Sequence, residues 1–333
     1  MGKSNKHISK IMGYGKMNGI KVSLICTLKN EESSVKEFLD SLLSQSRQPD
    51  EIIIVDGGST DRTVEIINSY IEKGAPIKLI VKEGANIAEG RNIAIKNAKY
   101  DVIASTDAGC RIDKHWLENL IKPFEEDPSV DVVSGWYEAD ARTEFEECVA
   151  ELTYPKLGRV LKDSNKFLPS SRSVAYKKTV WEKVGGYPEW LYTAEDTLFD
   201  LNLKKVGCKF VFAPDAVVYW KARSSIKDLF RQYYLYSGGD GHAKLFSISS
   251  VLTYVLYGLG LILLLSGFIY KFLWILLFVC VLYYLLKPTI PVYKRLKSKK
   301  VFIVIPIIKL TMDLGHMFGY VAGSIHGIKE RGI

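Results

Sequence analysis

Two long uncharged segments near the C-terminal end of the sequence constrain the organisation of the whole chain. No charged residue occurs from Ile248 to Tyr270, and after Lys271 a second uncharged run extends from Phe272 to Leu286. A helix over the first run would be ~35 Å long, which is enough to cross a bilayer. Two such runs in succession are rare in water-soluble proteins, so a buried hairpin in a soluble core is the less favoured alternative. We therefore predict a transmembrane helical hairpin over 248–287, with its tight turn at Gly267–Lys271.

A basic segment follows the hairpin at residues 288–300. It contains no acid and five basic side chains, at Lys294, Arg295, Lys297, Lys299 and Lys300. Loops rich in Lys and Arg stay on the cytoplasmic side of a membrane. Since a hairpin returns the chain to the side on which it started, the preceding residues are expected on that side as well. The sequence therefore predicts a multi-pass protein of the cell membrane whose soluble domain is cytoplasmic.

The last segment, 301–328, leaves two interpretations open. Lys309, Asp313 and His316 interrupt its apolar sequence, and a Lys or Asp at the centre of a spanning helix costs ~2.5–3.5 kcal/mol. A stripe of small residues, which lets another helix approach closely, recurs at Gly315, Gly319, Gly323 and Gly327. A third membrane span and an interfacial or re-entrant helix both fit this pattern.

Residues 21–223 have the mixed apolar and charged composition of a water-soluble domain. Short apolar runs alternate with segments whose apolar residues recur at helical spacing, as at Val35, Phe38, Leu39 and Leu42. The expected strands lie at 21–27, 51–56, 77–82 and 102–105, and a helix is expected after each of the first three. This repetition predicts an α/β fold with a mostly parallel sheet and helices on both faces.

The overall composition excludes several classes of protein. With 47% hydrophobic and 25% charged residues among 333, the chain is neither disordered nor collagen-like. Its net charge of +8 suits a nucleic-acid binder or a protein on an anionic membrane surface. Because the basic residues concentrate beside the uncharged runs, nucleic-acid binding is discounted. The 5 cysteines are widely spaced and predict free thiols, and residues 1–20, which contain no acid, predict a mobile basic tail.

Polar and acidic residues gather where the expected strands end. Thr27–Glu32 follows the first strand, Asp56–Asp61 the second, and Thr106–Gly109 the fourth. In an open α/β sheet, ligands bind beyond the carboxyl ends of the strands. Turn chemistry explains any one of these segments alone, whereas all three together favour a ligand site at this edge of the sheet.

Five segments in succession resemble glycosyltransferase family 2. They are the strand ending T-L-K-N-E-E, the strand ending V-D-G-G-S-T-D, Gly90-Arg91-Asn92, T-D-A-G after the fourth strand, and T-A-E-D at 193–196. The resemblance covers about residues 21–220. It implies a GT-A fold, which is a Rossmann-like nucleotide-sugar domain, followed here by C-terminal transmembrane helices. It also implies an inverting, hexosyl-type transfer from a nucleotide-diphosphate sugar.

The resemblance implies donor-binding roles for several residues at the strand ends. Thr27, Glu31 and Asp56 match positions near the nucleotide base and ribose. Arg91 matches an arginine on the diphosphate side, where its planar guanidinium suits phosphate oxygens. The alternative for Arg91 is a surface position paired with Glu89 or solvent.

The resemblance also implies a divalent cation, Mg²⁺ or Mn²⁺. Asp107 matches the first acid of the family's D-x-D metal motif and would contact the donor diphosphate as well. Gly109 replaces the second acid of that motif, and Asp113 is out of register. Asp107 is therefore the only metal ligand expected, and a structural role in capping a turn is its alternative.

The resemblance assigns catalysis to the T-A-E-D segment. Asp196 matches the family's general base, and Glu195 would orient that base or contact the acceptor. A helix containing Leu198, Leu201 and Val206 is expected to follow, so the Asp196 carboxylate would project from its N-terminus. A helix N-cap is the alternative role for Asp196.

Three residues are expected on the acceptor side of the site. Arg172 lies in the stretch that shapes this side in relatives, and Trp190 and Tyr192 follow it. The two aromatic rings would stack on a sugar face, although core packing explains them equally well.

Residues 224–247 predict an amphipathic interfacial helix and a linker. One helical face carries Ile226, Leu229, Phe230, Tyr233, Tyr234 and Ser237. Such a helix would hold the site near the lipid headgroups, and packing against the soluble domain is the alternative.

The same region bears on the reaction product. Membrane-bound processive synthases of this family carry Q-x-x-R-W near here, and Arg231–Tyr234 does not reproduce it. We therefore expect transfer of one sugar to a lipid-linked or membrane-proximal glycan acceptor, in cell-envelope glycan synthesis. A processive polysaccharide synthase and a catalytically inactive membrane scaffold are the alternatives. The missing second metal acid is the best support for the scaffold, and the presence of Asp56, Asp107 and Asp196 argues against it.

Overall fold

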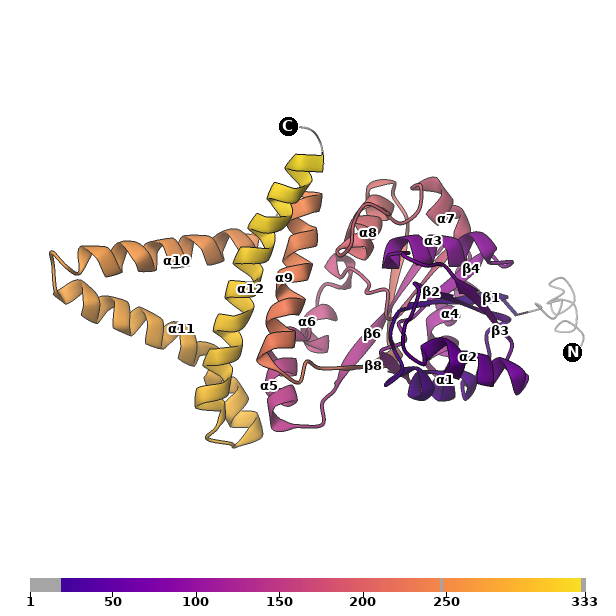
Figure 1. Ribbon diagram of the computed structural model, residues 1–333, viewed down its shortest axis with the longest axis horizontal. Coiled ribbons are helices and arrows are strands. Elements are labelled where there is room, and N and C mark those ends of the chain that lie inside the picture. Colours follow the sequence, from indigo (N-terminus) through magenta and orange to yellow (C-terminus); the bar gives the residue numbers. More distant parts are fainter. Residues whose placement is uncertain (1–18, 246–247, 331–333) are drawn as a thin grey trace, which may run out of the picture.

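The computed structural model describes residues 19–245 and 248–330, which form an α/β body joined to a group of C-terminal helices (Figure 1). The predicted basic tail, 1–20, lies outside the described residues except for its last two positions. The C-terminal helices gather at the end of the molecule opposite the N-terminal strands (Figure 1).

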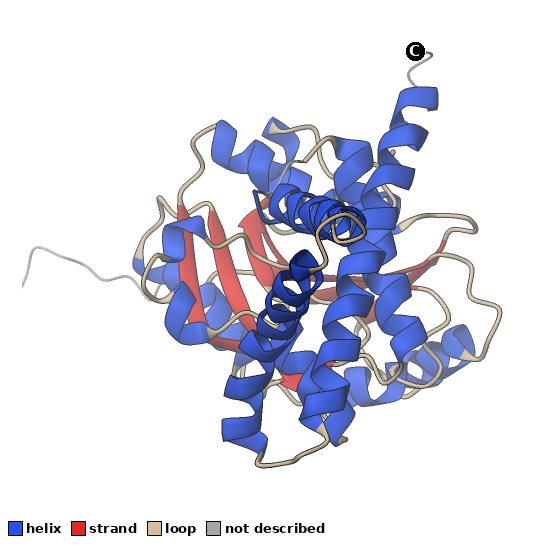
Figure 2. Ribbon diagram, turned by 90° about the vertical axis from the view of Figure 1, so that its left-hand side faces the viewer, coloured by secondary structure: helices blue, strands red, loops and turns tan. Residues whose placement is uncertain are grey.

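The N-terminal half of the sheet is parallel, as the repetition of strands and helices predicts. Its elements are β1 (Val22–Leu28), α1 (Val35–Leu43), β2 (Glu51–Asp56), α2 (Thr63–Glu72), β3 (Ile77–Val81), α3 (Ile87–Asn97) and β4 (Val102–Ser105). β1 lies between β2 and β4, and β3 pairs with β2 on the outside. Alternate residues of β2 contribute to two separate apolar cores, with Ile52 and Ile54 in one and Ile53 and Val55 in the other. Helices therefore cover both faces of the sheet (Figure 2).

The rest of the sheet is mixed. Its strands are β5 (Cys110–Ile112), β6 (Val132–Asp140), β7 (Val174–Lys177) and β8 (Phe210–Lys221), and the full order is β3-β2-β1-β4-β7-β6-β8-β5. β7 runs antiparallel to both β4 and β6, and β5 runs antiparallel to β8. The remaining helices of the body are α4 (Trp116–Glu126), α5 (Glu144–Thr153), α6 (Leu157–Val160), the 3-10 helix η1 (Ser164–Lys166), α7 (Lys178–Lys183) and α8 (Glu195–Lys205). The sheet is mostly parallel, as predicted.

Two long helices, α9 (Ile226–Ala243) and α12 (Val301–Glu330), pack closely side by side (Figure 1). Gly319 lies against the backbone of Tyr234, and Gly323 lies against the carbonyl of Gly238. A side chain at either glycine would overlap the backbone of α9. The small-residue stripe predicted from the sequence therefore allows a close helix approach, and α9 is the partner.

Part of the α9 face that was predicted to lie on lipid headgroups is covered by α12, and Ile226 and Tyr234 of that face stay 37% and 36% exposed. Leu229 is fully buried, and a Cβ at Gly315 of α12 would lie 3.0 Å from the Cβ of Tyr233. The glycines of α12 explain this contact. Because they have no side chains, α12 can lie directly on the apolar face of α9.

The predicted helical hairpin consists of α10 (Ile248–Ser266) and α11 (Phe272–Leu296), and its turn falls at 267–271 as expected. The indole of Trp274 folds back over this turn and donates to the Leu264 carbonyl at 3.1 Å. The hairpin projects away from the body of the molecule (Figures 1 and 2). Among the described residues, α11 and α12 are long and apolar enough to cross a membrane, and α10 is a shorter apolar helix.

The basic loop predicted at 288–300 is much shorter in the structure. α11 continues to Leu296 through Pro288 and Pro291, so only residues 297–300 connect it to α12. Packing on α5 supports the end of α11, because Val292 is buried and Arg295 pairs with Glu151 at 2.9 Å. The predicted loop was too long because a run of charged residues disfavours burial in a membrane but does not by itself end a helix.

We expect Gly323→Val to separate α12 from α9, since the new side chain would overlap the Gly238 carbonyl. Overpacking of this kind typically costs ~1–3 kcal/mol of unfolding free energy. Thermal unfolding of the detergent-solubilised protein, followed by tryptophan fluorescence, should show a lower Tm. Gly258→Val on α10 is the control, because a Cβ at Gly258 meets nothing within 4 Å. Equal Tm values for the two variants would contradict the proposed packing.

Candidate active site

Three parallel strands bring predicted site residues to one edge of the sheet. Leu28 of β1 is in register with Asp56 of β2, and Ile25 is in register with Ser105, the last residue of β4. Asp107 follows β4 after one intervening residue, so the carboxyl ends of β1, β2 and β4 meet at the same edge. Here the structure brings together side chains from β1, β2, the turn after β4, α3 and the start of α8.

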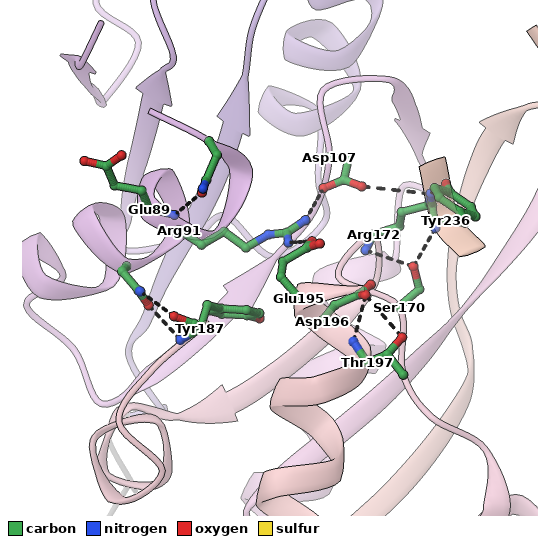
Figure 3. A network of polar contacts seen from close by, with 12 residues as sticks. Glu89, Arg91, Asp107, Ser170, Arg172, Tyr187, Glu195, Asp196, Thr197 and Tyr236 are labelled. Atoms are coloured by element: carbon green, nitrogen blue, oxygen red, sulfur yellow. Dashed lines mark hydrogen bonds and ion pairs between the residues drawn. The ribbon is translucent and has the colours of Figure 1, made fainter. Parts of the chain in front are cut away.

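Arg91 lies at the centre of this group (Figure 3). Its Nη1 donates to Glu195 Oε1 at 2.5 Å, and its Nη2 donates to Asp107 Oδ1 at 3.1 Å. Arg91 is only 2% exposed. The alternative surface position, paired with Glu89 or solvent, is therefore wrong. The buried guanidinium is paired with two carboxylates, because an unpaired buried charge would strongly destabilise the fold.

A close approach of α3 to β1 lets Arg91 reach the site. A Cβ at Gly90 would lie 2.9 Å from Cγ2 of Thr27, so only glycine leaves room at this contact. On its other side α3 is held by Asn92, whose amide donates to the Tyr187 carbonyl and accepts from the Tyr187 N–H, both at 2.9 Å. Arg91 is thus fixed between the sheet and the segment that leads into α8.

The two acids Glu195 and Asp196 form the first turn of α8. Ala194 occupies the N-cap position with a left-handed φ of 63°, so the N-cap role considered for Asp196 is wrong. One oxygen of Asp196 accepts from the Thr197 N–H at 2.8 Å (Figure 3). Burial and the neighbouring charge of Asp196 raise the pKa of Glu195, while Arg91 opposes this rise. A strained residue directly before two close carboxylates is typical of functional sites.

Arg172 joins the same network from the other side of Asp107. Its Nε lies 3.9 Å from Asp107 Oδ2, and its Nη2 donates to the hydroxyl of Tyr236 at 3.0 Å (Figure 3). The guanidinium stacks 3.8 Å from the ring centroid of Trp220. Tyr236 belongs to α9, and sequence reasoning did not single it out.

Three buried hydroxyl oxygens at the strand ends have no hydrogen-bond partner among the described residues. They belong to Thr27, Ser105 and Thr106. Leaving a buried hydroxyl unpaired typically costs ~1–3 kcal/mol. Because these oxygens lie where a ligand of an open α/β sheet binds, a bound polar ligand would satisfy them.

Asp56 and Glu31 bind their own loops in this structure. Asp56 is fully buried, and its Oδ1 accepts from the N–H groups of Gly58 and Ser59 at 2.9 and 2.8 Å. Glu31 accepts from the Ser34 hydroxyl, and burial raises the pKa of the Glu31 carboxyl. Both side chains shape the strand-end loops.

The aromatic residues predicted on the acceptor side are exposed, so the core-packing alternative is wrong for both. Trp190 is 54% exposed and Tyr192 is 68% exposed. The ring of Trp190 lies 4.9 Å from that of His242, at the C-terminal end of α9.

The residues of the site fit a divalent cation only if a bound phosphate and water supply most of its ligands. Within 19–245 and 248–330 no group of three His, Cys, Asp or Glu side chains is placed to hold a metal. The side chain of Asp107 is 25% exposed, no described residue donates a hydrogen bond to its Oδ2, and the Arg172 Nε lies 3.9 Å from that oxygen. One carboxylate oxygen completed by phosphate oxygens and water is a common arrangement for Mg²⁺.

Comparisons with known proteins find similar glycosyltransferases. A family model described as Glycosyl transferase family 2 matches residues 23–185. Among curated relatives, the uncharacterized glycosyltransferase EpsJ of Bacillus subtilis is 29% identical over 54% of this chain and 55% of its own length. The poly-beta-1,6-N-acetyl-D-glucosamine synthase of Staphylococcus aureus is 24% identical over 69% of this chain and 56% of its own length. The chain thus spans about half the length of the curated relatives it matches.

A solved structure extends the likeness over most of the chain. The mannosyltransferase of Pyrobaculum calidifontis, in complex with GDP-Man and Mn²⁺, is 17% identical and covers 93% of this chain and 88% of its own. The TM-score is 0.59. At this identity the likeness concerns the fold, and the predicted GT-A fold is confirmed.

We expect Asp200→Asn to change how stability depends on pH. Asp200 lies one turn after Asp196 and is 4% exposed, and burial together with the charge of Asp196 raises the pKa of Asp200. A raised carboxyl pKa stabilises the folded state below the unfolded value, ~3.9, and this contribution is lost as pH rises through the folded pKa. Asparagine does not ionise, so the Tm of the variant relative to the wild type should increase from pH 5 to pH 9.

Asp215→Asn is the matched control, because Asp215 is an exposed residue of β8. Its Tm relative to the wild type should stay constant over the same range. A Tm deficit of Asp200→Asn that grows towards pH 9 would mean that the folded protein stabilises the Asp200 carboxylate.

Proposed function

We propose that this chain is a glycosyltransferase, since its residues 23–185 match a family 2 model, and that it catalyses an inverting reaction that transfers one sugar at a time. The donor is a nucleotide-diphosphate sugar, and the acceptor is a lipid-linked or membrane-proximal glycan. The observation that carries this proposal is the bridge that Arg91 makes between Asp107 and the acid pair of α8. It connects the predicted donor side to the predicted base.

In the proposed reaction, Asp196 accepts the proton of the acceptor hydroxyl while that oxygen attacks the anomeric carbon. The bond to the nucleoside diphosphate breaks on the opposite face of the sugar. Glu195 is bonded to Arg91 and so fixes the first turn of α8, which carries Asp196. This arrangement holds the base without occupying its carboxylate with a cation.

Positive charge on the donor side would stabilise the departing diphosphate. Arg91 and Arg172 both face Asp107, and a guanidinium binds phosphate oxygens in a bidentate manner. Thr27 with the unpaired hydroxyls of Ser105 and Thr106 supports a nucleotide site at the adjacent strand ends. Asp107 is the residue that would hold Mg²⁺ or Mn²⁺, and such an ion would neutralise charge on the leaving group.

For the membrane region, we propose that α12 lies along the membrane surface beside the inserted α10–α11 hairpin. One face of α12 packs on α9, and the opposite face exposes an apolar stripe at Ile303, Ile307, Leu310, Leu314, Phe318, Val321 and Ile325. The hairpin projects away from the body instead of running alongside α12 (Figure 1). A bilayer crossed by the hairpin would therefore contact α12 along its length. The basic residues near the end of α11 support a cell-membrane location with the catalytic domain in the cytoplasm.

A processive synthase is the second candidate, because one curated relative is named as a polysaccharide synthase. The absence of Q-x-x-R-W at Arg231–Tyr234 favours single addition instead. Analysis of product length separates the two functions, since a polymer would exclude single addition.

We expect Asp196→Asn to lower sugar transfer by ~10²–10⁴-fold, the usual contribution of a general base. Nucleotide binding should persist, because the amide keeps the shape of the side chain. The measurement combines a transfer assay with a thermal-shift screen of nucleotide sugars, with and without Mg²⁺ or Mn²⁺. Asp215→Asn should behave as the wild type. If no nucleotide sugar raises the Tm of the wild type, the inactive scaffold becomes the better account.

We expect nitroxide labels along α12 to report one shallow membrane depth. Labels at Ile303, Leu314 and Ile325 would span ~33 Å of helix, in a background with Cys208 and Cys280 replaced by serine. A helix on the surface gives similar depths at all three positions in vesicles, by oxygen and nickel-complex relaxation. A spanning helix would place Leu314 deepest, and that result would refute the surface arrangement. Labels at Phe278 and Ile290 of α11 should differ in depth and serve as the positive control.

A further inference from the structure

Helix α9 forms part of the active site as well as the contact with α12. Tyr236 bonds to Arg172, and Asp240 lies four residues later on the same helical face. Tyr236 and Asp240 therefore lie on one face of α9, and the Tyr236 hydroxyl meets Arg172 of the site there.

Two contacts fix α9 against the segment that precedes the catalytic acids. The Thr193 hydroxyl donates to the Leu235 carbonyl at 2.6 Å. Gly239 lies so close to the Thr193 backbone that any side chain at 239 would overlap it. Since Thr193 is three residues before Asp196, the position of α9 relative to the base is tightly set.

Asp240 is a half-buried acid that follows Gly239, the residue of α9 that lies against Thr193. Burial and the negative charge of Asp196 raise the pKa of Asp240 to about 6. No described residue forms a hydrogen bond or an ion pair with its carboxyl group in the structure. A half-buried carboxyl without such a partner destabilises a fold, and a ligand that donates hydrogen bonds would remove this cost.

Resting on the proposed function, we infer that Asp240 binds a ring hydroxyl of the acceptor next to the hydroxyl that Asp196 deprotonates, and that the acceptor is a neutral sugar. Hydroxyl groups donate strong, charge-assisted hydrogen bonds to carboxylates. A phosphate acceptor would meet two negative side chains on this side of the site and would be repelled. Arg172 is directed at Asp107 and the donor side.

The test uses the full chain in a sugar-free zwitterionic detergent and measures release of nucleoside diphosphate from a panel of UDP- and GDP-sugars. Release without an acceptor reports donor binding and hydrolysis. Octyl monosaccharides are the neutral acceptor probes, and farnesyl phosphate is the anionic probe. We expect an octyl monosaccharide to stimulate release and farnesyl phosphate to have no effect.

In Asp240→Asn, the octyl monosaccharide concentration that gives half-maximal stimulation should rise about tenfold or more, since a charge-assisted hydrogen bond is weakened. The KM for the donor should stay at the wild-type value, and the Tm should not fall, because the substitution removes a half-buried carboxyl that has no partner among the described residues. Asp228→Asn is the control on the same helix, about three turns away from the site, and should leave the half-maximal concentration unchanged. A rise in that concentration without a fall in Tm separates acceptor binding from a structural role.

Three results would each overturn the inference: an unchanged half-maximal concentration in Asp240→Asn, stimulation by farnesyl phosphate in place of the sugars, or stimulation by neither probe. Failure of the proposed function looks different. In that case no nucleotide sugar would be hydrolysed by the wild type, or Asp196→Asn would retain full transfer.

Discussion

A buried guanidinium needs negative partners, and in this protein that need brings three distant parts of the chain together. Arg91 is bonded to Asp107 in the turn after β4 and to Glu195 at the start of α8, which is 104 positions later. Removing one partner from such a buried charge typically costs ~3–5 kcal/mol. The fold therefore docks α8 on α3 in one register, and Asp196 is carried into the site as a consequence.

The second constraint is the shortage of space around α9. This helix packs on α12 through Gly238 and Gly241, and it packs on Thr193 through Gly239. Glycine in a helix interior is disfavoured by ~1 kcal/mol relative to alanine. The glycines of α9 therefore lower the stability of the helix itself, but they allow close contacts on two of its sides. Because α9 contacts both α12 and Thr193, which precedes the first turn of α8, it sets the position of α12 relative to Glu195 and Asp196.

The local parts of this fold were predictable from the sequence, and the long-range parts were not. Helix α1 buries Val35, Phe38 and Leu39 as its spacing predicts, because helical periodicity is a property of neighbouring residues. The ion pairs of Arg91 and the role of Tyr236 depend on segments far apart in the sequence, and no local pattern encodes them. The glycines of α9 were the available signal, since several in one helix of 18 residues indicate close packing on more than one side.

The charges of the site are divided in a way that suits the transfer reaction. The cations Arg91 and Arg172 face Asp107 at the predicted donor side, whereas Asp196 and Asp240 lie on the side formed by α8 and α9. During transfer, negative charge develops on the departing diphosphate and positive charge develops on the attacking oxygen until its proton leaves. Preorganised charges of opposite sign at these two ends favour that separation, because they need no reorganisation as the reaction proceeds. In the proposed reaction, Asp196 on the acidic side would take the proton that leaves the acceptor.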